Sequence, residues 1–224
     1  MRIVLLPGLD GTAKLFNRFI AAAPPDVSLA ALALPSEDLT YEQLADRIDS
    51  TLPEGQIVLV AESFSGPLAL ALTERRIFAG VVLCNSFVVA PRPWALRWLA
   101  LPALFTLPLP DFLLRRYMVG AGADDALVRA LAAAVASVPS AVLASRVRSV
   151  LTVDAMNAFA RSAVPILYLR GTEDRLVPDS AVRGMAAARH FPIARVPGPH
   201  LLLQANPVGA WEAILPFLDS LRAT

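Results

Sequence analysis

Three kinds of side chain that together can perform nucleophilic catalysis follow one another along the chain. Ser63 ends an apolar run that begins at Ile57, an acid at position 173 or 174 follows Gly171, and His200 follows a proline-rich turn. A serine hydroxyl is a weak nucleophile until a histidine accepts its proton, and a carboxylate keeps that histidine in the required tautomer. If the fold brings these side chains together, they can catalyse acyl transfer through a covalent intermediate on the serine.

The segment around Ser63 reads Ile-Val-Leu-Val-Ala-Glu-Ser-Phe-Ser-Gly over residues 57–66. It predicts a buried strand, a serine on the turn and the start of a helix, which would project the hydroxyl above the sheet edge. Strand and helix nearly touch at such a turn, so small residues are needed around the serine; Ala61 and Ser65 meet this need, and Gly66 adds room. Two alternatives stay open here: Ser63 could merely cap the helix, or Ser65 could be the nucleophile.

The elements that must position these residues are short apolar strands that alternate with helical patterns. Such alternation is typical of an α/β fold, with a mostly parallel sheet and helices on both faces. Six strands are expected, near residues 2–6, 28–34, 56–61, 80–84, 165–170 and 192–196. The serine, the acid and the histidine each follow the carboxyl end of a strand, and open α/β sheets place functional residues at that edge.

The alternation stops after the fourth strand. Residues 87 to about 160 begin with a proline-rich stretch and continue as alanine-rich helical patterns, without a clear strand. An excursion of roughly 70 residues in a compact domain is usually a lid or cap rather than a loop. We therefore expect one domain, with a core of residues 1–86 and 161–224 and a helical cap of residues 87–160.

The combined pattern resembles the α/β-hydrolase fold superfamily, and within it the serine esterases and thioesterases. The turn at Ser63 resembles the nucleophile elbow of that family, although Ala61 and Ser65 replace the glycines of the usual Gly-x-Ser-x-Gly form. This departure makes the motif less specific but leaves its geometric logic intact. The resemblance implies that Ser63 is a covalent nucleophile.

The same resemblance assigns the other two members of a catalytic triad. The segment from Pro165 to Pro178 resembles the acid-bearing segment of the family and gives the role to Asp174, with Glu173 as the rival. His200, in the loop after the last strand, resembles the base of the family. The other histidine, His190, precedes that strand and is expected at the opposite end of the sheet.

An oxyanion hole is implied by the loop after the first strand. In the family this loop supplies one backbone donor and the residue after the nucleophile supplies the other, which here gives the N–H groups of Leu9 and Phe64. Pro7-Gly8 stands where the family more often has His-Gly. An ordinary glycine turn is the alternative reading of this loop.

Composition excludes several other classes of protein. The 224 residues carry a net charge of +1 and no basic run, so no nucleic-acid partner is expected. Cys84 stands alone, which excludes an intrachain disulfide and fits a reducing compartment. Two histidines and one cysteine leave little for a transition-metal site, and the implied acyl chemistry needs no metal or cofactor. No apolar run is long enough for a transmembrane segment, so we expect a soluble, cytoplasmic protein.

Hydrophobic residues make up 56% of the chain and charged residues only 17%, and much of this excess falls in the expected cap. The stretch is rich in large apolar side chains: Trp94, Leu96, Trp98, Leu99, Leu101, Leu104, Phe105, Leu107, Leu109, Phe112 and Leu113. Some of them are expected to line an apolar acyl or alcohol site. A homodimer interface or a membrane-contacting lid remains an alternative.

Four arginines of the same segment, Arg92, Arg97, Arg115 and Arg116, could meet an anionic substrate tail or form a solvated face. Asp10 and Glu62 could contact a polar substrate group or be structural. We interpret the chain as a serine hydrolase that cleaves a carboxylic ester or thioester with an apolar moiety. A lyase or acyltransferase of the same fold, and a ligand-binding protein without turnover, are the alternatives.

Overall fold

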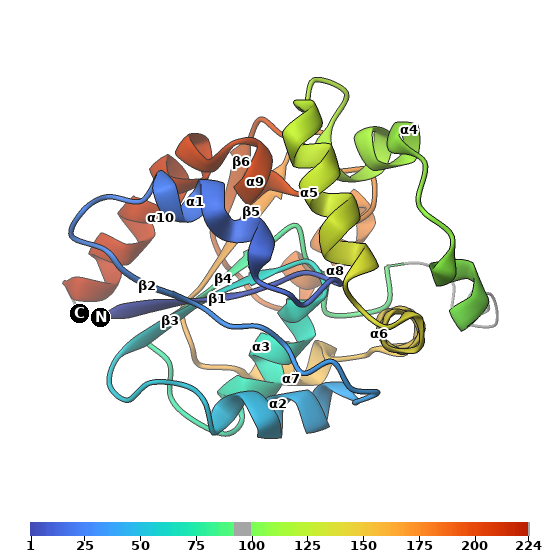
Figure 1. Cartoon of the computed structure of the whole chain (residues 1–224). Coiled ribbons are helices and arrows are strands. Elements are labelled where there is room, and N and C mark those ends of the chain that lie inside the picture. The colour runs from blue at the N-terminus through green and yellow to red at the C-terminus, as the bar shows by residue number, and fades with distance from the viewer. Residues whose placement is uncertain (92–99, 224) are drawn as a thin grey trace.

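The computed structural model describes residues 1–91 and 100–223, and a parallel sheet forms its centre (Figure 1). Its six strands are β1 (Arg2–Leu6), β2 (Ser28–Ala31), β3 (Ile57–Glu62), β4 (Gly80–Cys84), β5 (Ile166–Gly171) and β6 (Ile193–Val196). Their spatial order is β2-β1-β3-β4-β5-β6, and every neighbouring pair is parallel. The predicted α/β fold with a six-stranded sheet is therefore confirmed.

The strands form where the chain offers continuous apolar runs. Every residue of β3, β4 and β5 is buried, as expected for strands covered on both faces. Alternate residues of β1 serve opposite sides, since Val4 and Leu6 belong to one apolar cluster and Ile3 and Leu5 to another. β2 is shorter than predicted because the chain leaves the sheet towards the β1 loop, where Leu34 donates to the carbonyl of Gly11 (2.8 Å).

Helices cover both faces of the sheet (Figure 1). One face carries α2 (Tyr41–Asp49), α3 (Ser65–Thr73), α7 (Met156–Arg161) and α8 (Asp179–Ala188). The other carries η1 (Lys14–Phe16), α1 (Asn17–Ala21), α9 (Leu202–Ala205) and α10 (Pro207–Arg222). Stacking of Trp211 on Phe19, with ring centroids 4.4 Å apart, joins α10 to α1.

The chain between β4 and β5 lies over the edge where the strands end. Its described elements are η3 (Pro102–Thr106), α4 (Asp111–Leu114), the π-helical turn η4 (Arg115–Val119), α5 (Asp125–Ala136) and α6 (Ser140–Thr152). An antiparallel bridge between Val89 and Asp154 joins the start of this segment to its end, and Ala155 donates to the carbonyl of Val88 (2.7 Å). The α7 helix that follows packs on the sheet through Phe159. The division into core and cap at residues 87–160 stays a prediction.

Some expectations for this segment fall outside the described residues, namely those for Arg92, Trp94, Leu96, Arg97, Trp98 and Leu99. Arg115 lies within the described part, where it donates to the carbonyl of Ala123 and pairs with Asp125. In residues 1–91 and 100–223 no single helix is both long and apolar enough to cross a membrane. Only α5 and α6 taken together reach that length and composition, and they are bent by 99° at their junction.

Candidate active site

Ser63 sits on a strained turn between β3 and α3. Its φ of 48° lies in the left-handed region, which costs a residue with a side chain on the order of 1–3 kcal/mol. The turn is held from both sides: Ser63 donates its N–H to the carbonyl of Cys84 (2.9 Å), and its own carbonyl accepts from the hydroxyl of Ser86 (2.5 Å). The neighbouring end of β4 thus fixes the backbone on which the hydroxyl stands.

Residues 65 and 66 are small because helix and sheet meet there. A Cβ placed on Gly66 would lie 1.9 Å from the hydroxyl oxygen of Ser86, so no larger residue fits without a backbone shift. Ser65, the rival nucleophile, is fully buried and donates its hydroxyl to the carbonyl of Pro7 (2.5 Å). Its hydroxyl therefore joins α3 to the β1 loop.

The three side chains expected to form a triad lie in one hydrogen-bonded series. Nε2 of His200 is 2.8 Å from Oγ of Ser63, and Nδ1 of His200 is 3.0 Å from Oδ1 of Asp174. With the Nδ1 proton donated to the carboxylate, Nε2 is left to accept the serine proton. The rivals Glu173 and His190 are both exposed, and within the described residues neither forms a hydrogen bond to this series.

Asp174 is buried but well provided with donors. Oδ1 accepts from the N–H groups of Leu176 (2.8 Å) and Val177 (3.3 Å), and Oδ2 accepts from the guanidinium of Arg170 (3.0 Å). Burial alone would raise the pKa of Asp174, but His200, the backbone donors and Arg170 together outweigh it and lower that pKa below its usual range. The acid is therefore ionised at neutral pH.

Arg170 is a residue that sequence reasoning missed. It is buried at the end of β5, where its guanidinium spans Asp174 and the exposed Asp179 (2.9 Å). A charged residue at the end of an otherwise apolar strand, four positions before the acid, was the available signal.

Asn85 holds the histidine loop and was also missed. This buried residue follows β4 with a φ of 43°, and its side-chain N–H₂ donates to the carbonyls of Pro199 (3.0 Å) and His200 (2.8 Å). Its side-chain oxygen accepts from Gly171 N–H (2.7 Å). Asn85 therefore joins the ends of β4 and β5 to the backbone of His200.

The two expected oxyanion donors lie beside Ser63. Leu9 and Phe64 both line the cavity into which Ser63 opens, and neither backbone N–H donates to another residue in the part of the chain that the structure describes. The loop that carries Leu9 is shaped by Asp10, whose carboxylate accepts from the N–H (2.9 Å) and hydroxyl (2.6 Å) of Thr12. Asp10 is thus committed to its own loop.

Arg146 of α6 holds this loop from the other side. It is almost fully buried, and its guanidinium donates to the carbonyls of Leu9 (2.9 Å), Asp10 (2.8 Å) and Pro35 (2.9 Å). Gly11 leaves the room for it, since a Cβ there would lie 2.4 Å from the guanidinium. Burial lowers the pKa of Arg146, and the Asp10 carboxylate partly opposes that effect.

Glu62, next to the proposed nucleophile, is buried in a pair with Gln204. The side-chain N–H₂ of Gln204 donates to Oε2 of Glu62 (3.1 Å), while Oε1 of each residue has no hydrogen-bond partner within the described chain. Burial raises the pKa of Glu62 to about 8, with the charge of Asp10 adding to the rise and the Gln204 hydrogen bond opposing it. Glu62 therefore stays mostly protonated at neutral pH.

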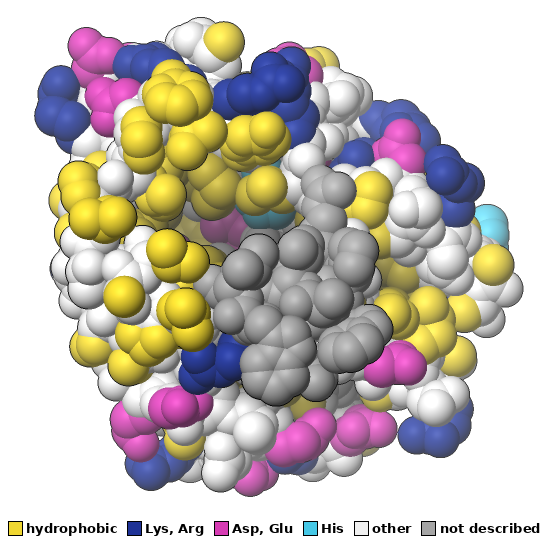
Figure 2. Space-filling model, turned by 90° about the vertical axis from the view of Figure 1, so that its right-hand side faces the viewer, with side chains coloured by type: hydrophobic (Ala, Val, Ile, Leu, Met, Phe, Trp, Pro, Cys, Tyr) yellow, Lys and Arg dark blue, Asp and Glu magenta, His cyan; other side chains and the backbone are white. Residues whose placement is uncertain are grey.

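The site opens into an apolar cavity of about 280 Å³. Ser63, His200 and Asp10 are its polar lining residues. The apolar ones include Phe64 and Leu201 beside the triad, and others come from the β1 loop, the segment after β4, η3, α4, η4, α5, α6 and the Asp174 loop. Figure 2 shows a hollow in the surface that is bordered by hydrophobic side chains, with acidic and histidine side chains visible inside it. Within the described chain, no group of three or more metal-ligating side chains occurs.

Comparisons with known proteins agree with this architecture. A family model described as "Alpha/beta hydrolase family" matches residues 3–213. A comparison with curated proteins finds no match.

Solved structures with the same fold are numerous. The enol-lactonase from Burkholderia xenovorans LB400 aligns with a TM-score of 0.80 and 19% identity, over 97% of this chain and 90% of that one. A thermophilic esterase from Thermogutta terrifontis aligns with a TM-score of 0.79 and 18% identity, over 99% and 90% of the two chains. A bromoperoxidase from Bacillus anthracis aligns with a TM-score of 0.80 and 14% identity, over 97% and 91%. At these identities the likeness shows a common fold.

Proposed function

The chain belongs to the α/β-hydrolase family, and from that premise we propose that it is a serine hydrolase that cleaves a carboxylic ester or thioester with an apolar moiety. The observation that carries the proposal is the hydrogen-bonded series Ser63–His200–Asp174 at the wall of an apolar cavity. An esterase and an enol-lactonase among the similar structures support ester chemistry.

In the proposed reaction, Nε2 of His200 accepts the hydroxyl proton as Oγ of Ser63 attacks the carbonyl carbon of the substrate. The tetrahedral intermediate collapses to an acyl-enzyme, and the imidazolium returns the proton to the departing alcohol or thiol. Water then attacks the acyl carbon by the same route, with His200 as its base, and the carboxylic acid leaves. The 2.8 Å contact between Ser63 and His200 supports the first proton transfer.

Asp174 has the role of orienting and stabilising His200. Its lowered pKa keeps it ionised, so that it accepts a hydrogen bond from Nδ1–H and stabilises the imidazolium that forms during each half-reaction. Arg170 donates to the other carboxylate oxygen, Oδ2, and helps to keep Asp174 ionised.

The backbone N–H groups of Leu9 and Phe64 are the proposed oxyanion donors. Donors without another partner, placed beside the nucleophile, can stabilise the developing negative charge by roughly 3–4 kcal/mol each. Arg146 and Asp10 support this role because they fix the loop before the reaction starts.

The lining of the cavity favours an apolar substrate. Apart from Asp10, Ser63 and His200, the lining residues are apolar, so that a charged group bound there would lose its hydration without a partner. An apolar acyl group gains from the same environment.

The test combines covalent labelling with turnover. A fluorophosphonate probe is expected to modify Ser63, found by peptide mapping, and p-nitrophenyl butyrate is expected to be hydrolysed. Ser63→Ala should abolish labelling and lower kcat by at least about 10³-fold, as removal of a serine nucleophile does in comparable triads. Ser65→Ala, the matched control at the rival serine, should still be labelled at Ser63.

Labelling at Ser65, or turnover that survives Ser63→Ala, would contradict the mechanism. Wild-type protein that neither labels nor turns over any ester would favour a ligand-binding protein. A product in which the acyl group is transferred to an added alcohol rather than to water would favour an acyltransferase.

A further inference from the structure

A second cavity lies directly beside the catalytic one. It has a volume of about 590 Å³ and follows η3, the chain up to Leu114, the second half of α5 and the start of α6. Phe105, Leu109, Leu114 and Val135 line both cavities. The catalytic cavity and the second one, which we call the outer groove, therefore adjoin along these four side chains.

We propose that the substrate is an ester of a long-chain acyl group, whose carboxyl end is bound at Ser63 and whose distal methylenes occupy the outer groove. The inference rests on the proposed function, because the chain is placed by the acyl carbon that Ser63 attacks. The observation that supports it is that the two cavities are adjacent: the four shared apolar side chains offer a continuous hydrocarbon surface from one cavity to the other.

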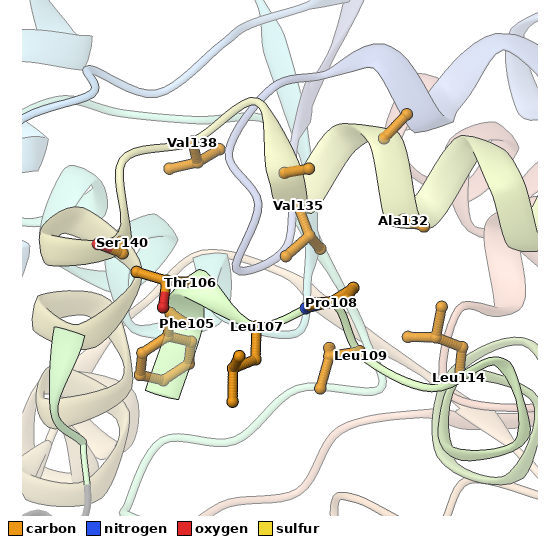
Figure 3. Close-up of a pocket in the computed structure, with 12 residues that line it drawn as sticks. Phe105, Thr106, Leu107, Pro108, Leu109, Leu114, Ala132, Val135, Val138 and Ser140 are labelled. Atoms are coloured by element: carbon orange, nitrogen blue, oxygen red, sulfur yellow. The ribbon is translucent and has the colours of Figure 1, made fainter. Parts of the chain in front are cut away.

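The shape of the outer groove suits an extended hydrocarbon chain. Figure 3 shows Leu107, Pro108 and Leu109 on one side, and Ala132 and Val135 of α5 on the other. With Ala133 and Ala136, α5 presents a row of small side chains that leaves the groove open. Residues 132–136 advance about 6 Å along the helix, enough to contact several successive methylenes.

The chemistry of the lining excludes a charged tail. No lining residue of the outer groove is charged, and Thr106 and Ser140 are its polar members. At the same time large apolar side chains face water here, since Leu107 is 67% exposed, Leu109 50% and the nearby Phe112 66%. A bound chain would remove part of this surface from water, which is the favourable term in apolar association.

The position of the groove selects the acyl side of the ester. His200 protonates the leaving group, so the leaving group lies on the histidine side of the reacting carbon and the acyl chain lies away from it. Leu201, beside His200, packs with Leu127, Val128 and Leu131 of α5. The outer groove shares Leu114 and Val135 with this cluster, but its far end at Phe105 and Val138 belongs to a separate cluster with Val142 and Leu143 of α6.

The test measures kcat/KM for p-nitrophenyl esters of four to twelve carbons, each kept below the concentration at which it aggregates. Buried methylenes favour binding by about twofold to fourfold each, so wild type should prefer the twelve-carbon ester. Ala132→Trp fills the groove and should lower kcat/KM at least about tenfold for twelve carbons and less than twofold for four. Ala130→Trp, the same change at an exposed α5 position outside both cavities, should alter neither.

Equal losses for both esters with Ala132→Trp, or no loss, would overturn the inference while leaving the hydrolase intact. The same holds if the chain-length dependence appears with long alkyl acetates instead of long acyl esters, since the groove would then bind the alcohol. Failure of the proposed function looks different: the four-carbon ester is not hydrolysed and Ser63 is not labelled.

Discussion

Several residues around the site are buried charged groups that each have a specific partner. Arg170 is the clearest case, because one guanidinium serves the buried Asp174 and the exposed Asp179 at nearly equal distances of 3.0 and 2.9 Å. Buried and exposed ion pairs differ greatly in their effect on stability. Substitutions that remove the pair with Asp174 and the pair with Asp179 should therefore change the free energy of unfolding by different amounts.

We expect Arg170→Met to lower the free energy of unfolding by about 3–5 kcal/mol at pH 7, because it leaves the Asp174 carboxylate buried without its cation. Asp179→Ala, the matched control at the exposed end, should change it by less than about 1 kcal/mol. Urea titration measures both. Because the folded pKa of Asp174 is lowered, its contribution is present above the unfolded pKa and is lost as the pH falls through the folded pKa. Equal effects of the two substitutions would contradict this account.

The pKa of Glu62 is shifted in the opposite direction to that of Asp174. Its folded pKa is raised to about 8, so the folded state holds a proton that the unfolded state loses above its ordinary pKa. The wild-type free energy of unfolding should therefore fall as the pH rises from about 5 to 8. Glu62→Gln should remove this fall and be more stable than wild type at pH 8, with a smaller difference at pH 5.

Urea unfolding at the two pH values checks the Glu62 prediction, and Glu54→Gln at an exposed position serves as the control. The interpretation fails if Glu62→Gln keeps the pH dependence of wild type, or if Glu54→Gln removes it.

At the scale of elements, α6 reaches over the sheet edge to hold the loop of Leu9. The guanidinium of Arg146 donates to the carbonyls of Leu9 and Asp10, which lie 137 and 136 positions earlier in the chain. If the N–H of Leu9 stabilises the transition state, its position depends on this helix.

We expect Arg146→Met to lower kcat by about 10²-fold with a smaller effect on KM, since a lost or misplaced oxyanion donor acts in the transition state. Arg148→Met, on the same helix but partly exposed, should stay within about threefold of wild type. Steady-state kinetics with p-nitrophenyl butyrate, with circular dichroism as a check of folding, distinguish the outcomes. A rise in KM alone would instead place Arg146 in substrate binding.

The elements also show what sequence could reveal. Ser63, Asp174 and His200 each follow a strand with a recognisable local pattern, and the resemblance to the family, rather than spacing alone, distinguished Ser63 from Ser65 and Asp174 from Glu173. Arg146, Asn85 and Gln204 act through partners more than 100 positions away, and nothing in their own neighbourhoods distinguishes them from surface residues. Tertiary packing creates their environment, and a single sequence does not encode that environment locally.

At the scale of the whole molecule, the segment over the site is packed onto the histidine loop. Leu201 belongs to an apolar cluster with α4, η4 and α5, and its N–H donates to the carbonyl of Met118 (2.8 Å). The two large clusters on either face of the sheet are separate from it. We therefore expect the part of the segment from α4 to α5 to loosen before the sheet unfolds, with His200 as the catalytic residue nearest to that change.

We expect Leu127→Ala, in the cluster with Leu201, to reduce activity at temperatures below the main unfolding transition. The matched change Leu218→Ala, buried in α10 against the sheet, should lower global stability by about 2–5 kcal/mol but leave activity normal until the protein unfolds. Parallel thermal scans of ester hydrolysis and circular dichroism measure both. Coincident loss of activity and structure in Leu127→Ala would show that the segment does not loosen separately.

The backbone at Ser63 holds a residue with a side chain in a conformation that favours glycine. A left-handed φ of 48° suits glycine, and a serine there forgoes on the order of 1–2 kcal/mol of stability. Glycine would relieve this strain but remove the hydroxyl, whereas alanine would remove the hydroxyl and keep the strain, because the strain comes from the Cβ. The serine thus combines a less relaxed backbone with the side chain that the proposed reaction needs at this turn.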